Sequence, residues 1–147
     1  MIIKPADVDD SLDILNWRNN LQTRNMSFDI REVSLEDHTC WFEKSLKSDT
    51  RYLYIGMEAG QKIGVCRYDL NLDEQQCEVS INLNPLHRGK GLAKPFLRLS
   101  MKKFLTLHTV PVLARIKRDN TSSIQVFESC GYKQSPFDDG ALLYIYS

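Results

Sequence analysis

Residues 77–93 read CEVSINLNPLHRGKGLA, and this stretch decides the fold. Its first half alternates between apolar and polar side chains, the pattern of a strand with one buried face. Its second half is a turn-rich loop with two glycines, Gly89 and Gly91, directly before a segment of helical periodicity. Glycines let a backbone approach a ligand closely, and the free N–H groups of a helix start favour an anion such as pyrophosphate. The stretch therefore predicts either a phosphate cradle or an ordinary glycine turn ahead of a helix.

Two helices are predicted in the N-terminal third. The first covers about residues 8–19 with Asp7 as its N-cap, because a carboxylate there accepts from free N–H groups of the first turn. Its buried side is predicted from three apolar residues at helical spacing, Val8, Leu12 and Leu15. The second begins after Ser34 and reaches about Lys47, with four residues on one side: Leu35, His38, Phe42 and Leu46. The intervening residues 24–31 have no clean period and are predicted to be a loop.

Strands and helices alternate along the rest of the chain. Strands are predicted at 2–4, 52–57, 63–70, 77–83, 110–116 and 142–146, and helices at 92–108 and 122–130. Pro95 falls in the first turn of the long helix, where a missing N–H is tolerated. This order predicts an α/β fold, a mixed sheet flanked by helices, in a single domain over residues 1–147.

Composition narrows the class of protein. The 147 residues hold 19 Lys and Arg against 19 Asp and Glu, and a neutral chain has no long-range field for polyanions, so no nucleic-acid partner is expected. The four cysteines form no C-x-x-C pair and the three histidines are scattered, so we expect no metal site. The chain also lacks a signal-peptide pattern and any apolar run near the ~18 residues of a membrane span. We therefore expect a cytoplasmic protein with no membrane partner.

Two segments resemble the GCN5-related N-acetyltransferases, the GNAT superfamily. The acetyl-CoA loop of that family reads Gln/Arg-x-x-Gly-x-Gly/Ala between a strand and a helix, and residues 86–91 here read LHRGKG, with Leu86 departing at the first position. Residues 120–132, NTSSIQVFESCGY, resemble the family's Asn-x-x-Ser/Ala element, whose helix ends in Gly and an aromatic residue. Taken alone, the second segment is also typical of an Asn-capped amphipathic helix.

The resemblance implies a mostly antiparallel sheet with a splayed pair of parallel strands, at about 77–83 and 112–116. Acetyl-CoA, the implied co-substrate, would lie in the gap, where backbone groups of residues 81–83 hold the pantetheine and a backbone N–H polarises the thioester carbonyl. The residues implied to bind acetyl-CoA are Ile81, Asn82, Leu83, Arg88, Gly89, Lys90, Gly91, Leu92, Ala93, Asn120, Ser123 and Phe127.

Acetyl transfer to an amine needs a group that accepts the amine's proton. Glu78 is the candidate base, because it lies on the strand that carries the family's frequent base; the alternative is a solvated strand glutamate. The family's usual general acid is a Tyr in the last helix, and the matching position here is Phe127, which has no proton to donate. The sequence leaves open whether water protonates the thiolate or CoA leaves as thiolate.

The N-terminal third resembles one branch of the superfamily, through Trp17-Arg18-Asn19 and through residues 34–42, SLEDHTCWF. This branch contains N-acetyltransferases of UDP-linked 4-amino-4,6-dideoxy sugars, as in pseudaminic acid pathways, and adjoins the N-terminal acetyltransferases of ribosomal proteins. The resemblance implies that Arg18 and His38 face a nucleotide diphosphate and that Met26 and Phe28 lie near its base. Arginine suits phosphate because its planar fork makes paired hydrogen bonds.

Three functions remain open on the sequence. The Arg18 and His38 pair and the neutral charge favour acetylation of a nucleotide-linked amino sugar. A protein N-terminal acetyltransferase should show an acidic groove for a basic peptide, and a non-catalytic acyl-CoA-binding sensor is motivated by the missing Tyr. His38, on the apolar side of its helix, is alternatively a half-buried core residue. We expect a small-molecule amine as acceptor and leave a homodimer open.

Overall fold

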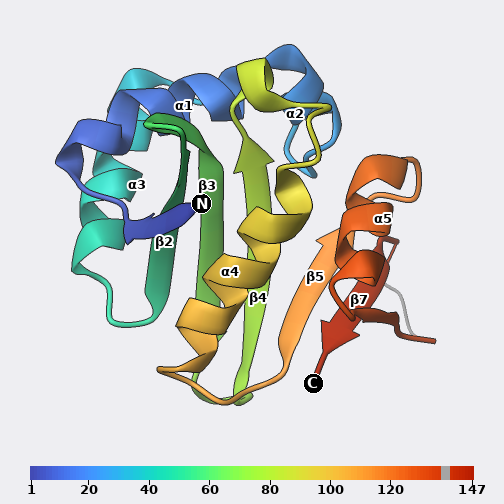
Figure 1. Ribbon diagram of the computed structural model, residues 1–147. Helices are drawn as coiled ribbons and strands as arrows, with labels where there is room; N and C mark the ends of the chain where they lie inside the picture. The colour runs from blue at the N-terminus through green and yellow to red at the C-terminus, as the bar shows by residue number, and fades with distance from the viewer. Residues whose placement is uncertain (137–139) are drawn as a thin grey trace.

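A mixed sheet with helices on both faces forms the body of the protein, in a computed structural model that describes residues 1–136 and 140–147 (Figure 1). Within these residues the sheet has seven strands in the order β1-β2-β3-β4-β5-β7-β6. They are β1 (Ile2–Pro5), β2 (Arg51–Glu58), β3 (Gln61–Asn71), β4 (Gln76–Leu83), β5 (Val112–Ile116), β6 (Lys133–Gln134) and β7 (Leu142–Tyr146). β4 and β5 are parallel, and the other neighbours are antiparallel. The predicted α/β fold is confirmed, with the short β6 as an addition.

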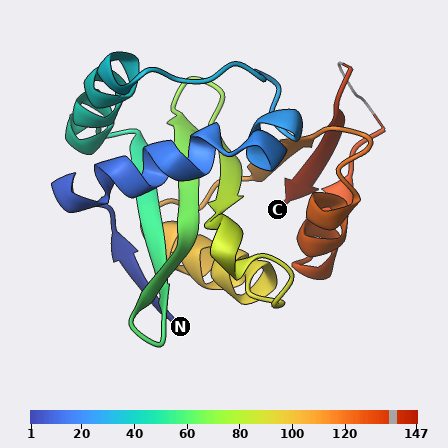
Figure 2. The ribbon, with the colours of Figure 1, turned by 90° about the horizontal axis from the view of Figure 1, so that it is seen from above.

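Helices separate the two faces of the sheet into different environments (Figure 2). α1 (Ser11–Asn19) and α3 (Leu35–Lys47) cover one face, and α4 (Ala93–Leu105) and α5 (Thr121–Ser129) cover the other. The larger apolar core lies under α4 and α5, around the fully buried side chains of Tyr68, Phe96 and Phe104. A smaller cluster under α1 and α3 contains Ile14, Trp17, Phe42, Leu53, Ile55 and Val65.

The predicted buried side of the first helix is wrong for Val8 and Leu12, although Leu15 is buried as predicted. Asp7 caps the chain as expected, but it caps a 3₁₀ turn over Val8–Asp10 that precedes α1 and shifts its phase. Val8 and Leu12 are consequently 72% and 61% exposed, whereas Ile14 and Trp17 face the sheet. Asp10, on the same side as Ile14 and Trp17, is buried, and its carboxylate accepts from Lys4 Nζ at 2.8 Å and contacts Lys62 Nζ at 2.7 Å.

The segment between the first two predicted helices contains a helix of its own. α2 (Leu21–Asn25) follows the predicted end of the first helix, and its last two residues lie in the segment predicted to be a loop. The Asn20 side chain caps it by accepting from the N–H groups of Gln22 and Thr23. α3 begins as predicted, with Ser34 Oγ accepting from Asp37 N at 3.1 Å. His38 and Phe42 on its predicted inner side are buried, but Leu35 and Leu46, predicted on the same side, are 58% and 36% exposed.

β4 and β5 are joined over a very short length. Their register holds only Cys77 opposite Val112 and Glu78 opposite Leu113, after which the strands diverge. Figure 1 shows the resulting V-shaped gap, which opens toward the C-terminal ends of both strands. By the register, the gap begins directly after the pair of Glu78 and Leu113. The splayed parallel pair is confirmed. The gap lies between the two halves of the sheet and positions the site described next.

Candidate active site

The glycine loop after β4 has the backbone shape expected of a phosphate cradle. Gly89 and Gly91 both have φ +72°, a left-handed conformation that side-chain-bearing residues rarely adopt. A Cβ built on either glycine meets no described atom within 4 Å, so the space above the loop is open. Lys90 between them is exposed. The loop therefore presents backbone to solvent where a phosphate could approach.

The start of α4 adds free donors beside this loop. Leu92 is the N-cap and provides no side-chain hydrogen bond to the helix, so the first-turn N–H groups depend on an external partner. Ala93 begins the helix, and Pro95 lies in its first turn, as predicted, where its missing N–H removes one unpaired donor. This end of a thirteen-residue helix is also the positive end of its dipole, so loop and helix together suit an anion.

One edge of β4 faces the gap with its backbone groups. Asn84 N donates to Ile63 O at 2.8 Å, on the β3 side, and Cys77 N donates to Pro111 O at 2.9 Å, on the β5 side. Since backbone groups alternate along a strand, those of Ile81 and Leu83 point into the gap. Asn82 differs: its backbone pairs with β3. The edge of β4 at Ile81 and Leu83 therefore leaves backbone groups unpaired by β5, the kind of edge to which an extended ligand adds as a strand.

α5 borders the open side of the gap. Asn120 Oδ1 accepts from Ser123 N at 3.2 Å, so Asn120 serves as the cap of α5, and both residues lie at the end of the helix nearest the mouth of the gap. Phe127 is buried, and Tyr132 packs edge-on against it with ring centroids 4.9 Å apart. The hydroxyl of Tyr132 donates to Met101 Sδ at 3.2 Å, and burial raises the pKa of Tyr132. Tyr132 is therefore a structural residue. It does not replace the general acid that the family usually has as a tyrosine at the position of Phe127.

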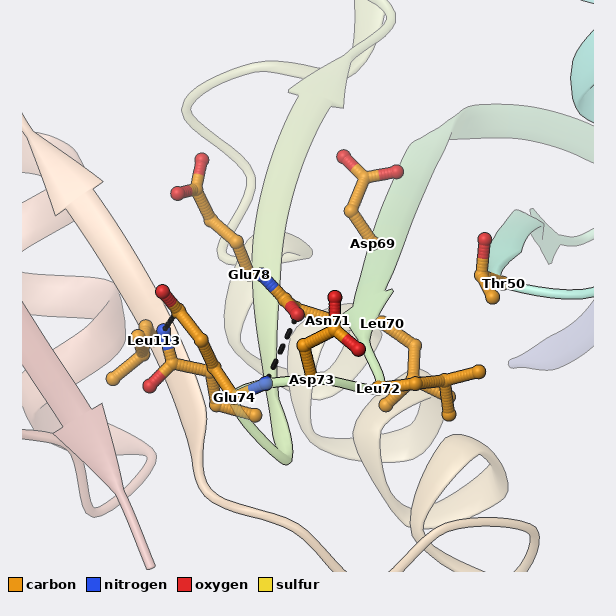
Figure 3. Close-up of a pocket in the computed structure, with 10 residues that line it drawn as sticks. Thr50, Asp69, Leu70, Asn71, Leu72, Asp73, Glu74, Glu78 and Leu113 are labelled. Carbon is orange, nitrogen blue, oxygen red and sulfur yellow. Dashed lines mark hydrogen bonds between the residues drawn. The ribbon is translucent and has the colours of Figure 1, made fainter.

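Glu78 stands at the vertex of the gap. It is the last β4 residue paired with β5, and its exposed side chain points the same way as Asp69 of β3, its neighbour in register (Figure 3). Both line a cavity of about 600 Å³ at this end of the sheet, together with Asp73 and Glu74 of the β3–β4 turn. Asp69 contacts two arginines, Arg51 Nε at 2.6 Å and Arg67 Nε at 3.0 Å. Its charge is thereby neutralised, whereas Glu78 has no ion-pair partner among the residues that the structure describes.

A second cavity, of about 280 Å³, lies on the same face of the sheet beneath α1 and α3. It is lined by Arg18 and His38, which the sequence assigned to the acceptor, and by Trp41, Arg67, Ser80 and Asn82, among others. Ser80 and Asn82 follow Glu78 along one face of β4, so this cavity borders the gap from the side opposite α4 and α5. We call it the acceptor cavity. It places Arg18 and His38 together but does not include Glu78.

Arg18 has unused hydrogen-bonding capacity in the acceptor cavity. Its Nη2 donates to Asp29 O at 2.8 Å, but its Nη1 is buried and has no hydrogen-bond partner among the described residues. Burial lowers the pKa of Arg18, the Asp29 carboxylate raises it, and the positive charge of Arg67 lowers it again. A guanidinium stays charged in a protein despite such shifts, so Arg18 offers a free charged donor to a ligand.

His38 has a structural partner. It is 3% exposed, and its Nε2 lies 2.9 Å from Ser11 O, an atom that only accepts, so Nε2 carries the proton. The ring also stacks on Phe42, with centroids 5.6 Å apart. Burial lowers the pKa of His38, and the bond to Ser11 offsets part of this effect. The geometry favours the core interpretation of His38 over direct contact with a phosphate.

Met26 and Phe28 lie outside the acceptor cavity. Both are exposed, and the guanidinium of Arg115, on β5, stacks over the Phe28 ring at 5.4 Å. Sequence reasoning missed Arg67, which lines the acceptor cavity and lies 5.8 Å from the Trp41 ring centroid. The alternation of β3 could have identified Arg67. Its neighbours Cys66 and Tyr68 are fully buried on one face of the sheet, so Arg67 points to the opposite face.

Comparisons with known structures agree on this architecture. A spermidine N-acetyltransferase from Vibrio cholerae, in complex with CoA and spermine, superposes with a TM-score of 0.85 at 17% identity, covering 98% of this chain and 92% of that one. A domain from Methanocaldococcus jannaschii gives 0.83 at 22% identity, covering 99% and 96%. A ribosomal-protein-alanine N-acetyltransferase from Brucella melitensis gives 0.81 at 19% identity, covering 99% and 97%. At these identities the likeness establishes the fold.

The sequence itself assigns the family. A search of curated proteins finds no relative of this chain. None of the helices in residues 1–136 and 140–147 combines the length and apolar character that crossing a membrane requires. The model of one protein family, described as an acetyltransferase (GNAT) domain, matches residues 1–133, which include the gap, the glycine loop and the acceptor cavity. With the splayed strands and the loop in place, the chain belongs to the GNAT acetyltransferases, a family that uses acetyl-CoA as its acetyl donor.

Proposed function

We propose that this N-acetyltransferase acetylates an amine whose carrier molecule bears an anionic group, as a nucleotide-linked amino sugar does. The observation that carries the proposal is the buried, unpartnered Nη1 of Arg18 in the acceptor cavity, with Arg67 lining the same space. A buried charged donor without a partner is costly, and a phosphate or carboxylate from the acceptor would satisfy it. Arg67 would add a second positive charge, although its ion pair with Asp69 compensates part of that charge.

Each part of the site has a task in this proposal. The edges of β4 at Ile81 and Leu83 hold the donor in the gap, and a backbone N–H there stabilises charge on the thioester oxygen. The loop at Gly89 and Gly91 holds the pyrophosphate. Glu78, at the vertex, accepts the proton of the acceptor ammonium, directly or through water, so that a neutral amine meets the thioester. Protonation of the leaving thiolate falls to water, because Phe127 has no hydroxyl.

A basic acceptor is the second candidate. The cavity at Glu78 also holds the carboxylates of Asp73 and Glu74, and an acidic surface attracts a polyamine or the N-terminus of a basic peptide. The similar structures named above include acetyltransferases of spermidine and of a ribosomal protein. Against this candidate, the acceptor cavity itself presents two arginines and one carboxylate, that of Asp37, and this excess of positive charge would disfavour a polycation.

One experiment separates the candidates. Acetyl-CoA turnover, measured as free thiol, is compared for UDP-linked amino sugars, spermidine and peptides with ribosomal-protein N-termini. We expect turnover with a UDP-amino sugar and competitive inhibition by UDP alone. Turnover with spermidine or a peptide, unaffected by millimolar UDP, would move the assignment to a basic acceptor. CoA binding with no turnover on any acceptor would favour the acyl-CoA sensor.

A further inference from the structure

The acceptor cavity and the cavity at Glu78 are neighbours along one face of β3 and β4. We call the cavity at Glu78 the vertex cavity. Asp69 and Glu78 are opposite each other in the register and line the vertex cavity, whereas Arg67 and Ser80, the next opposite pair on this face, line the acceptor cavity. Two residues along a strand cover about 6.5–7 Å, so the two cavities are one pleat repeat apart. Figure 3 shows the carboxylates of Asp69 and Glu78 pointing along β4 toward its C-terminal end, the direction in which the acceptor cavity lies.

The two cavities carry charges of opposite sign. The lining of the vertex cavity has no basic side chain and four carboxylates, those of Asp69, Asp73, Glu74 and Glu78. The lining of the acceptor cavity has two arginines, Arg18 and Arg67, and one carboxylate, that of Asp37. The sign of the charge thus changes over a single pleat repeat. This arrangement is complementary to a molecule that carries an ammonium group at one end and an anion at the other.

The ion pair of Arg67 and Asp69 marks the boundary between the two cavities. Asp69 Oδ1 accepts from Arg51 Nε of β2 at 2.6 Å, and Arg51 Nη1 donates to Ser45 Oγ at 3.2 Å, so Asp69 is held from the side of β2 and α3. Asp69 Oδ2 in turn lies 3.0 Å from Arg67 Nε. No described residue accepts a hydrogen bond from the Arg67 side chain, so its terminal N–H groups are available to a ligand. The distance between the two charged regions is therefore set by paired strands.

We propose that the two cavities form a ruler, which selects amines whose anionic group lies about 7 Å from the nitrogen, with Asp69 as the residue that positions Arg67. The ammonium group lies at Glu78, and the anion lies between Arg18 and Arg67. An extended chain covers about 3.3–3.6 Å in three bonds, so about six bonds between the nitrogen and the anionic centre fit this distance. The inference rests on the proposed function, because it requires an acceptor with an anionic group.

The test compares ω-aminoalkyl phosphates of two, four, six and eight carbons as acceptors, with turnover of acetyl-CoA measured as free thiol. In the four-carbon compound six bonds separate nitrogen from phosphorus. We expect kcat/KM to be highest for this compound and at least about tenfold lower for the two- and eight-carbon compounds, because misplacing a reacting atom by about 1 Å is already costly. Butylamine, which lacks the phosphate, and 1,4-diaminobutane, which carries a cation in its place, are controls of matched length and should be poor acceptors.

The outcomes separate the ruler from the proposed function. A preference for the phosphates with the same kcat/KM at every chain length would overturn the ruler alone. Use of butylamine or 1,4-diaminobutane as efficiently as the four-carbon phosphate would overturn the anionic acceptor and the ruler together. Acetylation of none of the phosphates would also overturn the ruler, because two charges at the correct distance would then not define an acceptor.

Asp69→Asn tests the positioning role, because it keeps the shape of the side chain and removes the charge that holds Arg67. The preference for four over eight carbons should fall from about tenfold to less than about threefold, with the Kd of CoA unchanged. A purely structural residue would instead lower turnover equally at all lengths. Arg67→Lys, which keeps the charge but loses the Nε that contacts Asp69, should broaden the preference in the same way. Asp73→Asn removes an equal charge from the vertex cavity and should keep the length preference. A length preference that is unchanged in both Asp69→Asn and Arg67→Lys would overturn the role of Asp69.

Discussion

Arg18 of α1 and Arg67 of β3 face the same cavity, but their guanidinium groups have different partners. Arg67 Nε contacts Asp69 Oδ2 at 3.0 Å, whereas Arg18 donates to a backbone carbonyl, that of Asp29, and keeps a buried Nη1 without a described partner. The two charges are close enough for Arg67 to lower the pKa of Arg18. An anion between them would relieve this repulsion, and the free donor belongs to Arg18.

Arg18→Ala should therefore weaken acceptor use far more than donor use. Hydrogen bonds to charged groups contribute about 1.5–3 kcal/mol each, so kcat/KM for an anionic acceptor should fall tenfold or more. The Kd of CoA should stay the same, because the donor lies in the gap. Arg31→Ala, which removes an exposed arginine that pairs with the Asp29 carboxylate outside the acceptor cavity, is the control and should leave kcat/KM near its natural value. Equal effects of the two variants would contradict an anion site at Arg18.

His38→Gln should change stability and leave the kinetics of the folded enzyme largely intact. Burial, the larger influence, lowers the pKa of His38, so the unfolded chain binds a proton more readily than the folded one. This part of the stability is present above about pH 6.5 and is lost as the pH falls through the folded pKa. Glutamine can still donate to Ser11 O, so the variant should lose the pH dependence of Tm between pH 7 and 5. An acid-enhanced loss of acceptor binding in His38→Ala would instead assign His38 to the phosphate.

Gly89→Ala should weaken CoA binding while the fold survives. The backbone at Gly89 is left-handed, which costs a side-chain-bearing residue about 1–2 kcal/mol, and a Cβ there would enter the open space that the phosphate needs. Gly60→Ala in the β2–β3 turn is the control, because φ is +78° there and the space around it is equally open. Calorimetry with CoA should show weaker binding for Gly89→Ala alone. Equal CoA affinities in the two variants would remove the phosphate-cradle interpretation.

Glu78→Gln should lower kcat by about 10²–10⁴, the usual contribution of a positioned general base. CoA affinity should be nearly unchanged, since Glu78 lies at the vertex and away from the glycine loop. Glu74→Gln removes an equal charge from the same cavity and tests whether negative charge in general is enough. If both variants keep the natural kcat across the pH range, Glu78 is a solvated strand residue and a water bound by the strand backbone takes its place.

Asp10→Asn should destabilise the fold at neutral pH and flatten its acid denaturation. Burial by itself raises the pKa of Asp10, but the hydrogen bonds from Lys4 and Lys62 and from Asp7 N lower it below its usual 3.8. The stability from this carboxylate is therefore present above about pH 4 and is lost as the pH falls through the folded pKa. The substitution should cost about 3 kcal/mol, the lower end for a broken buried pair, because Lys4 and Lys62 remain 32% and 28% exposed and can rehydrate. Urea unfolding at pH 7 and pH 3 measures both effects.

Local signals in the sequence were sufficient for much of this architecture. The caps at Asp7 and Ser34, the alternation of residues 77–83 and the glycine turn ahead of a helix all depend on neighbours a few residues away, and all are present in the structure. The resemblance of two motifs then predicted the splayed strands, which no local pattern encodes.

Features that depend on distant partners were not predictable in this way. The inner side of α1 follows from the burial of Asp10, which Lys4 and Lys62 make possible from two separate strands. α2 could not be predicted from a local pattern, because the residues that hold it in place, Arg88 and Lys117, lie far along the chain. The face to which Arg67 belongs was readable from the alternation of β3, but the cavity on that face exists only once α1 and α3 are packed over it.

In the proposed arrangement, β4 serves both reactants. Its free edge at Ile81 and Leu83 would face the donor, while Glu78, Ser80 and Asn82 line the cavities on the face covered by α1 and α3. Apart from β4, the acceptor cavity is built from residues that precede it in the chain, and the glycine loop and α5 follow it. Mutations before Gln76 in the lining of the acceptor cavity are therefore expected to alter which amine is accepted, whereas mutations at Asn20–Asn25 would also affect Arg88 and Lys117, which contact this segment. For protein engineering, the proposal thus divides the chain at β4 into a part whose substitutions should change the acceptor and a part whose substitutions should change donor binding.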